Sequence, residues 1–209
     1  MKNVLSTFGN IPVTSSAILS MYDGISSKSS KISQLEKAGE IIRLKRNVYI
    51  VNPQESGAIL SVGLISNHLL SPSYVSMQTA LRHYGIIPEA VYTIQAMTFK
   101  AAKTFTTPIG TFCYTHISEE AFHIGVTQIK ENNVVYLMAT PEKALCDLIA
   151  SQPGINLRYK KEALEFIEND LRFDMEKFYS LNPDILNEYA KVGKKQESIH
   201  TITKLLRNE

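Results

Sequence analysis

The chain has 209 residues, of which 44% are apolar, and a formal net charge of +2, which indicates a folded protein with one large domain or two small ones. It contains no run of 18 or more apolar residues, and its first ten residues lack the apolar stretch of a secretory signal, so we expect no membrane span and no export. The two cysteines, Cys113 and Cys146, match no zinc-binding spacing, which favours reduced thiols in a cytoplasmic protein.

Two short helices are predicted near the start of the chain. The turn dipeptide Asp23-Gly24 separates them, and Gly39 ends the second where a C-terminal glycine is common. Ser and Thr side chains can accept a hydrogen bond from the first free N–H groups of a helix. The residues that can do so here are Thr14 or Ser15 for the first helix and Ser26 or Ser27 for the second.

The second predicted helix has one apolar face and one polar, weakly basic face. At 100° per residue, Ile32, Leu35 and Gly39 fall within one narrow sector. The other side of the helix carries hydroxyl, amide and ammonium groups, which can bond to base edges and phosphates in a DNA major groove. The predicted DNA-facing residues of this helix are Lys28, Ser29, Ser30, Lys31, Ser33, Gln34 and Lys37.

Two short strands are predicted directly after this helix, over residues 41–44 and 48–51, with a basic turn between them. A winged helix-turn-helix has this order of elements: a helix, a turn, a second helix and a basic hairpin, which is the wing. Residues 1–51 carry seven Lys and Arg against three Asp and Glu, whereas residues 52–209 sum to −2. This asymmetry is typical of a DNA-binding module joined to another domain. The wing residues predicted to bind DNA are Arg43, Lys45, Arg46 and Asn47.

A domain boundary is predicted at Asn52-Pro53, because proline stops strand pairing. The fold class is therefore α+β, with a winged helix-turn-helix over 1–52 and a mixed α/β domain over 53–209 that ends in a helical segment, 153–209. Two or three helices are expected after Gly154. The elements expected before them are helices over 55–70 and 74–84, strands over 91–97, 110–117, 122–130 and 134–138, a hairpin turn at Asn132-Asn133, and a helix that starts at Thr140-Pro141-Glu142.

The sequence shows no constellation of catalytic or metal-binding residues. The five histidines are scattered, although His116 and His123 could approach each other across adjacent strands. No phosphate-binding loop, nucleophile elbow or HExxH helix is present. Glu142 suits the first turn of a helix, and Asp147 is expected to form a local hydrogen bond. We therefore expect no enzyme activity, no metal ion and no cofactor.

Three segments resemble the AbiEi family of bacterial antitoxins, which are transcriptional regulators of abortive-infection systems. Asn47 stands where many members have glycine, which is compatible because asparagine also adopts positive φ in turns. The likeness covers roughly residues 10–150, and the C-terminal helices do not align. Because the shared motifs are mostly structural, they indicate the family better than a mechanism. The segments are LEKAGEIIRLKRNVYIVNP (35–53), SPSYVSMQTALRHYGIIPEAVYTI (71–94) and VVYLMATPEKALCDLI (134–149).

The resemblance implies a repressor that binds double-stranded DNA in its own promoter region. It also implies a second domain that counteracts a nucleotidyltransferase-like toxin, in the usual description without a stable complex. A homodimer on an inverted repeat is usual for such regulators, but the sequence has no heptad or other dimer signature. The alternative is a protein-interaction module that uses the winged helix as a docking surface and does not touch DNA.

Overall fold

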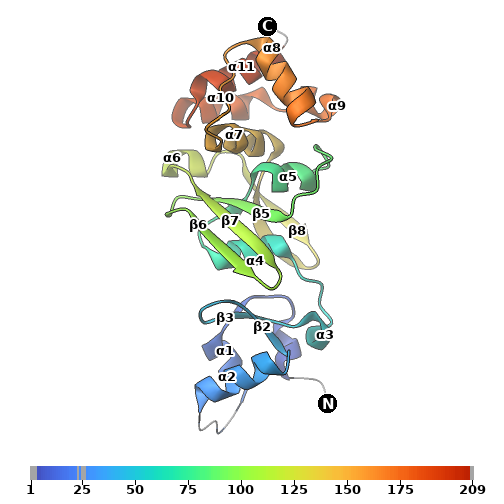
Figure 1. The fold of residues 1–209 in the computed structure, drawn as a ribbon, viewed down its shortest axis with the longest axis vertical. Coiled ribbons are helices and arrows are strands. Elements are labelled where there is room, and N and C mark those ends of the chain that lie inside the picture. Colours follow the sequence, from blue (N-terminus) through green and yellow to red (C-terminus); the bar gives the residue numbers. More distant parts are fainter. Residues whose placement is uncertain (1–3, 23, 25–26, 208–209) are drawn as a thin grey trace.

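The computed structural model describes residues 4–22, 24 and 27–207, which form three parts along one long axis (Figure 1). A small module of helices and three short strands lies at one end. A six-stranded sheet with helices on both sides follows, and a group of helices forms the other end. The expected α+β class is thus confirmed. None of the described helices is long and apolar enough to cross a membrane.

The N-terminal module contains both predicted helices and both predicted strands. Its elements are the 3-10 helix η1 (Val4–Phe8), the strand β1 (Val13–Thr14), the helices α1 (Ser15–Leu19) and α2 (Lys28–Lys37), and the strands β2 (Ile41–Lys45) and β3 (Val48–Val51). The strands form an antiparallel sheet in the order β1-β3-β2. Neither η1 nor β1 was predicted, because five residues and two residues are too short to show a periodic pattern.

Some of the local turn and capping signals in this module act as the sequence predicts. The Thr14 side chain accepts a hydrogen bond from the Ala17 N–H at the start of α1. Gly39 and Asn47 adopt positive φ of 75° and 62°, which ends α2 and closes the β2–β3 hairpin. Ser27 occupies the N-cap position of α2 but makes no side-chain capping hydrogen bond. The other expected cap, Ser26, and Asp23 of the expected turn lie outside the described residues.

The β2–β3 hairpin is buried on both faces. On one face Tyr49 packs in a cluster with Ile32 and Leu35 of α2. On the other face Leu44 and Ile50 pack with apolar side chains of the second part of the chain, namely Ile65, Leu69, Ala96, Phe112 and Tyr114. The predicted boundary at Asn52-Pro53 therefore lies just after a hairpin that belongs to two apolar cores.

The second part is built on a six-stranded mixed sheet in the order β6-β7-β5-β4-β9-β8. The helix α4 lies on the side nearer the N-terminal module, and α5 and α7 lie on the other side (Figure 1). The bounds are α3 (Pro53–Ser56), α4 (Val62–Leu69), β4 (Tyr74–Val75), α5 (Met77–His83), β5 (Thr93–Thr98), β6 (Lys103–Thr107), β7 (Gly110–His116), α6 (Glu119–Phe122), β8 (Val126–Glu131) and β9 (Val134–Ala139).

The prediction of one continuous helix over 55–70 is wrong. Gly57 adopts a left-handed conformation, with φ of 67°, which ends α3 after one turn. The chain then runs without regular structure until the Ser61 side chain accepts a hydrogen bond from the Leu64 N–H and starts α4. The apolar residues between these points only imitate a helical period, since Ile59 is 68% exposed.

Three other expectations are corrected near the sheet. The predicted helix over 74–84 begins only at Met77, because Tyr74 and Val75 pair with β5 and β9 in the middle of the sheet. The predicted strand over 122–130 begins only at Val126, because Ser118 caps the short helix α6 before it. The strand β6 was missed, since it is a largely exposed edge strand without an apolar pattern.

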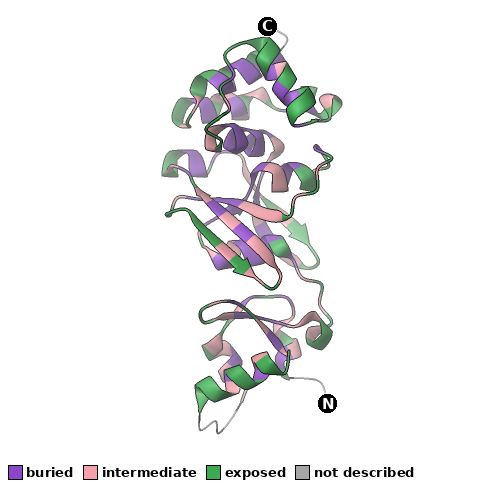
Figure 2. Ribbon diagram, viewed as in Figure 1, coloured by how far each residue is buried: buried purple, intermediate pink, exposed green. Residues whose placement is uncertain are grey.

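The C-terminal part has more helices than predicted, and their buried faces point toward one another (Figure 2). Its elements are α7 (Pro141–Ser151), α8 (Lys160–Glu165), the π-helical turn η2 (Phe166–Asp170), α9 (Met175–Tyr179), α10 (Pro183–Val192) and α11 (Gln196–Leu206). Thr140 caps α7 and Pro141 opens it, as predicted. Short helices such as α9 were not predicted because they are stabilised by packing rather than by a long periodic sequence.

A buried polar cluster connects α7 with the sheet and with the C-terminal helices. Lys143 and Asp147 are both fully buried and form an ion pair of 3.2 Å. Asp147 also accepts hydrogen bonds from the hydroxyls of Ser76 (2.7 Å) and Tyr74 (3.0 Å). The Lys143 ammonium lies 4.2 Å from the ring centre of Tyr189 on α10. Asp147 thus combines a local ion pair, with Lys143 four residues before it, with hydrogen bonds to residues more than 70 positions away in the sequence.

Candidate nucleic-acid interface

The helix α2 lies at the surface of the N-terminal module with its polar face outward (Figure 2). Ile32 and Leu35 are buried against the module, as the helical arithmetic predicts. Because two buried side chains fix the rotation of a short helix, the polar residues are turned to solvent. The exposed predicted residues of α2 are Lys28, Ser29, Ser30, Ser33, Gln34 and Lys37.

The exposed polar groups of α2 are not used by the fold. The side chains of Ser30, Ser33 and Gln34 have no hydrogen-bond partner within the part of the chain that the structure describes, and the ammoniums of Lys28 and Lys37 have no ion-pair partner there. Hydroxyl and amide groups can both donate and accept, and lysine donates only. The outer face of α2 therefore offers mixed hydrogen-bonding groups and positive charge to a ligand.

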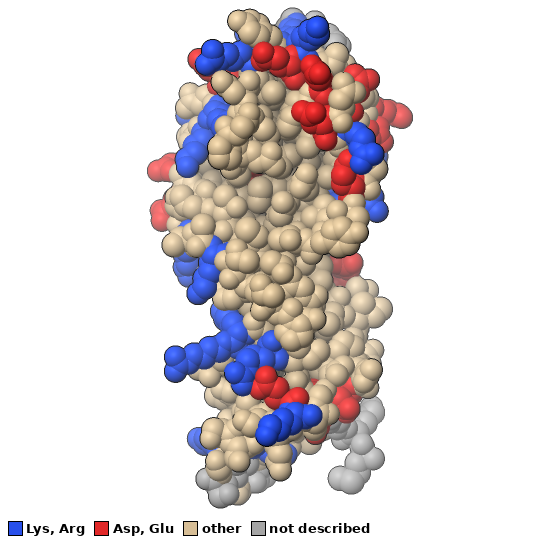
Figure 3. Space-filling view, in the orientation of Figure 1, with Lys and Arg blue, Asp and Glu red and all other residues tan. Residues whose placement is uncertain are grey.

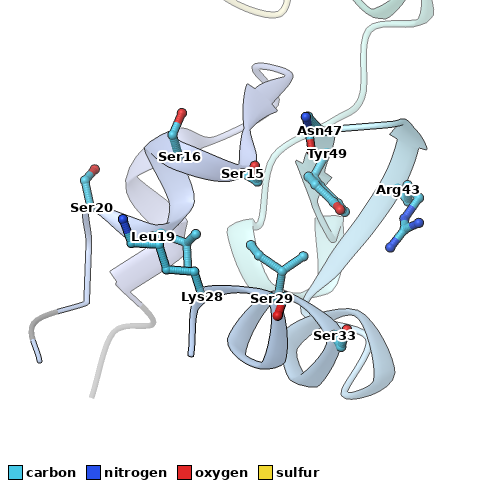
Figure 4. A pocket seen from close by; sticks show the side chains of 11 residues that line it. Ser15, Ser16, Leu19, Ser20, Lys28, Ser29, Ser33, Arg43, Asn47 and Tyr49 are labelled. Carbon is cyan, nitrogen blue, oxygen red and sulfur yellow. The ribbon is translucent and has the colours of Figure 1, made fainter. Parts of the chain in front are cut away.

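A hollow of about 610 Å³ lies between α1, α2 and the β2–β3 hairpin (Figure 4). Five of the predicted site residues line it, from both α2 and the hairpin: Lys28, Ser29, Ser33, Arg43 and Asn47. Sequence reasoning missed the lining residues from α1 and its C-cap, which are Ser15, Ser16, Leu19 and Ser20. The small polar residues at the start of α1 are a sequence signal for Ser15 and Ser16, whereas nothing in the sequence marks Leu19 and Ser20.

Arg43 connects the hairpin to α2 through an ion pair. Its guanidinium donates to the Glu36 carboxylate at 2.7 Å and lies 5.6 Å from the Tyr49 ring centre. Both ionised side chains are partly exposed, 51% for Arg43 and 34% for Glu36. Arginine has five N–H donors, so those not engaged by Glu36 can still reach a phosphate. The pair also neutralises Glu36, which is the only acidic residue of α2.

The lysines predicted as phosphate contacts are not equivalent in the structure. The Lys31 ammonium lies over the Tyr22 ring, 4.3 Å from its centre, at the edge of the exposed face. Lys45 points away from α2 and donates to the Leu69 carbonyl at 2.6 Å. Burial lowers the pKa of Lys45, and the nearby Lys103 and Lys100 ammoniums lower it further. Arg46 stays exposed at the hairpin turn. The structure therefore gathers the other predicted residues around α2 and the hairpin but directs Lys45 to the second part of the chain.

Residues considered for metal binding or catalysis do not come together. Within the described residues, no group of three His, Cys, Asp or Glu side chains is placed to hold a metal ion. His116 faces the Lys100 carbonyl at 3.2 Å, and His123 packs beside Phe122. Glu142 lies in the first turn of α7, as predicted, and its carboxylate accepts a hydrogen bond from the Asn182 N–H at 3.0 Å.

No protein-family model and no curated protein matches this chain.

Proposed function

We propose that the protein is a sequence-specific DNA-binding transcriptional regulator in which residues 1–52 act as a winged helix-turn-helix. The support is the order of elements, with α1 followed by α2 and then directly by the antiparallel β2–β3 hairpin. In this arrangement α2 is the recognition helix and the hairpin is the wing. The observation that carries the proposal is the outer face of α2, whose polar groups are exposed and have no partner among the described residues.

The proposed division of roles follows the position of each side chain. Ser30, Ser33 and Gln34 project from the outer face of α2 and would meet base edges in the major groove, with Lys37 beside them. The basic residues around this face would bind phosphates and set the register of the protein on the duplex. These are Lys28 and Lys31 of α2 and Arg43 and Arg46 of the hairpin.

We further propose that this regulator is an AbiEi-type antitoxin that represses its own operon and counteracts a nucleotidyltransferase-like toxin. The support for this part is the resemblance of residues 35–53, 71–94 and 134–149 to that family. Co-expression with the product of a neighbouring toxin gene tests it: rescue of growth is expected. Rescue should survive loss of DNA binding if the second part of the chain carries the antitoxin activity.

The DNA proposal is tested by fluorescence anisotropy with the duplex upstream of the protein's own gene and an unrelated duplex, each at two salt concentrations. We expect tighter binding to the first duplex and a steep loss of affinity with salt. Replacing Gln34 by Ala should weaken discrimination at one base pair by about 1–3 kcal/mol. Equal binding to both duplexes, or none, would contradict the proposal and favour the docking-surface alternative.

A control variant separates a base contact from a change in the fold. Gln128→Ala alters an exposed glutamine on β8, in the other part of the molecule, and should leave both affinity and base preference unchanged. If Gln34→Ala weakens binding to every duplex equally, α2 does not read base edges at this position.

A further inference from the structure

Three lysines from two segments of the chain converge where the hairpin meets the six-stranded sheet. Lys45 comes from β2, Lys100 precedes β6, and Lys103 is the first residue of β6. The ammoniums of Lys45 and Lys103 lie 5.7 Å and 4.9 Å from the centre of the same ring, that of Phe105. Lys100 and Lys103 are also close enough to Lys45 to lower its pKa. We call Lys45, Lys100 and Lys103 the lysine cluster.

Among the described residues, no acidic side chain forms an ion pair with the lysine cluster. Between Glu55 and Glu119 the sequence contains a single acidic residue, Glu89. Glu89 forms an ion pair with Arg172. Like charges held close together repel each other, so this surface keeps a positive potential that the fold does not neutralise.

Ordinary structural roles explain only parts of the cluster. Lys45 and Lys100 donate to the carbonyls of Leu69 and Ser71 at the C-terminal end of α4, where cations are favourable. That role does not require Lys103. A lysine on an edge strand discourages pairing with another sheet, which explains Lys103 on β6 but neither of the others. Neither role gives a reason for placing all three side chains together without an ion pair to any of them among the described residues.

The lysine cluster continues the basic surface of the N-terminal module. Figure 3 shows Lys and Arg side chains gathered along one side of the molecule, over the module, at the hairpin and beside β6. Lys45 is the neighbour in sequence of Arg46, which we place on a phosphate. A duplex held by α2 and the hairpin would therefore meet the cluster next as it extends toward the sheet.

We propose that the bound duplex continues across the junction and that Lys100 and Lys103 bind its flanking phosphates, so that the second part of the chain adds sequence-independent affinity. This inference rests on the proposed function, and it deepens it by assigning DNA contacts outside the winged module. Lys45 is half-buried with its ammonium on the Leu69 carbonyl, so it contributes mainly to the local potential. Lys100 also donates to a carbonyl, that of Ser71, but it is exposed, and its remaining N–H groups can reach a phosphate.

The test uses the full chain with both lysines replaced, Lys100→Gln and Lys103→Gln, and the duplex upstream of its own gene. The logarithm of the affinity for B-DNA falls linearly with the logarithm of the salt concentration, with a slope of about 0.9 for each phosphate contact. Loss of two contacts should therefore make this slope shallower by up to about 1.8. Between 50 and 200 mM salt, this corresponds to up to about 12-fold less salt-induced loss of affinity than in the unaltered protein. The protein's preference for the duplex upstream of its own gene over an unrelated duplex should not change, because phosphates carry no sequence information.

A matched control removes the same charge elsewhere. Lys130→Gln with Lys160→Gln neutralises two exposed lysines, one on the opposite edge strand β8 and one on α8, and should leave the slope unchanged. The variant with Lys100→Arg and Lys103→Arg keeps both charges and should keep the slope. For the Lys100/Lys103 glutamine variant, an unchanged midpoint of urea unfolding shows that the fold is intact.

The outcomes separate this inference from the proposed function. If the unaltered protein binds no duplex, both fail. If it binds its own duplex and the Lys100/Lys103 glutamine variant has the same affinity and slope, only the contact at the junction is overturned. An equal loss in the control variant also overturns it, since net charge rather than the lysine cluster would then be responsible.

Discussion

The helices α2 and α7 have almost the same length, ten and eleven residues, and both carry charged side chains, but these side chains have opposite surroundings. The polar side chains of α2 are exposed and have no partner among the described residues, apart from the Glu36–Arg43 pair and Lys31 over Tyr22. In α7, Glu142, Lys143 and Asp147 are buried, and each has partners from other elements. Polar groups on a helix therefore indicate a ligand site only where the fold leaves them unused.

The largest effect should come from the buried pair of α7. Replacing Asp147 by Ala leaves the Lys143 ammonium buried without its carboxylate, which typically costs 3–5 kcal/mol of unfolding free energy, so we expect a loss of about that size. Urea denaturation followed by circular dichroism measures it. The matched change on α2, Ser30→Ala, should alter stability by less than about 0.5 kcal/mol. A loss below about 1 kcal/mol for Asp147→Ala would show that the pair does not hold α7 in place.

A smaller effect is expected at the junction between the hairpin and the sheet. Tyr114 is buried there, donates to the Ser66 carbonyl at 2.6 Å, and burial raises its pKa to about 12 from the ordinary value of 10.0. The folded state therefore keeps the Tyr114 proton between pH 10 and 12 while the unfolded chain loses it. Tyr114 therefore makes its full contribution to the free energy of unfolding below pH 10. This contribution, at most about 2.7 kcal/mol, is lost as the pH rises toward 12.

Urea midpoints measured at pH 9 and pH 11 test this prediction, with Tyr114→Phe as the comparison. The phenylalanine variant should be less stable at pH 9, because it loses the hydrogen bond, but its stability should fall less between the two pH values. Identical pH dependence in both proteins would contradict the assignment of this loss to Tyr114.

On α2, charge changes should affect binding and leave stability nearly unchanged. Replacing Lys28 by Gln removes an exposed cation that we place on a phosphate, so the slope of log affinity against log salt should become shallower by up to about 0.9. Urea denaturation of the same variant should shift by less than about 1 kcal/mol. A large loss of stability with an unchanged salt slope would reverse the contrast between α2 and α7.

The smallest expected effect concerns the exposed pair between Glu36 and Arg43. A surface ion pair contributes about 0.2–1 kcal/mol, so Glu36→Gln should change stability by no more than this. The same variant frees Arg43 and removes the only acid of α2, so we expect affinity for DNA to rise a few-fold and the salt slope to steepen by about 0.9. Glu168→Gln, an exposed acid in η2, is the control and should change neither. Weaker binding by Glu36→Gln would mean that the pair positions Arg43 for a phosphate.

The sequence by itself determined the elements whose signals are local. The Thr14 cap, the Gly39 helix end, the Asn132-Asn133 turn and the Thr140-Pro141 helix start all act within a few residues of themselves, so their short-range hydrogen bonds and φ preferences were enough. The helical period of Ile32 and Leu35 likewise fixed which face of α2 is exposed.

The tertiary structure alone decided features that depend on partners far away in the sequence. Tyr74 and Val75 become a strand only because β5 and β9 lie on either side of them. Lys45 has the same chemistry as Lys28, yet it bonds to the Leu69 carbonyl and leaves the surface around α2. A side chain's hydrogen-bonding capacity is a property of its residue type, whereas the groups that satisfy it are set by packing, which brings together residues that the sequence keeps apart.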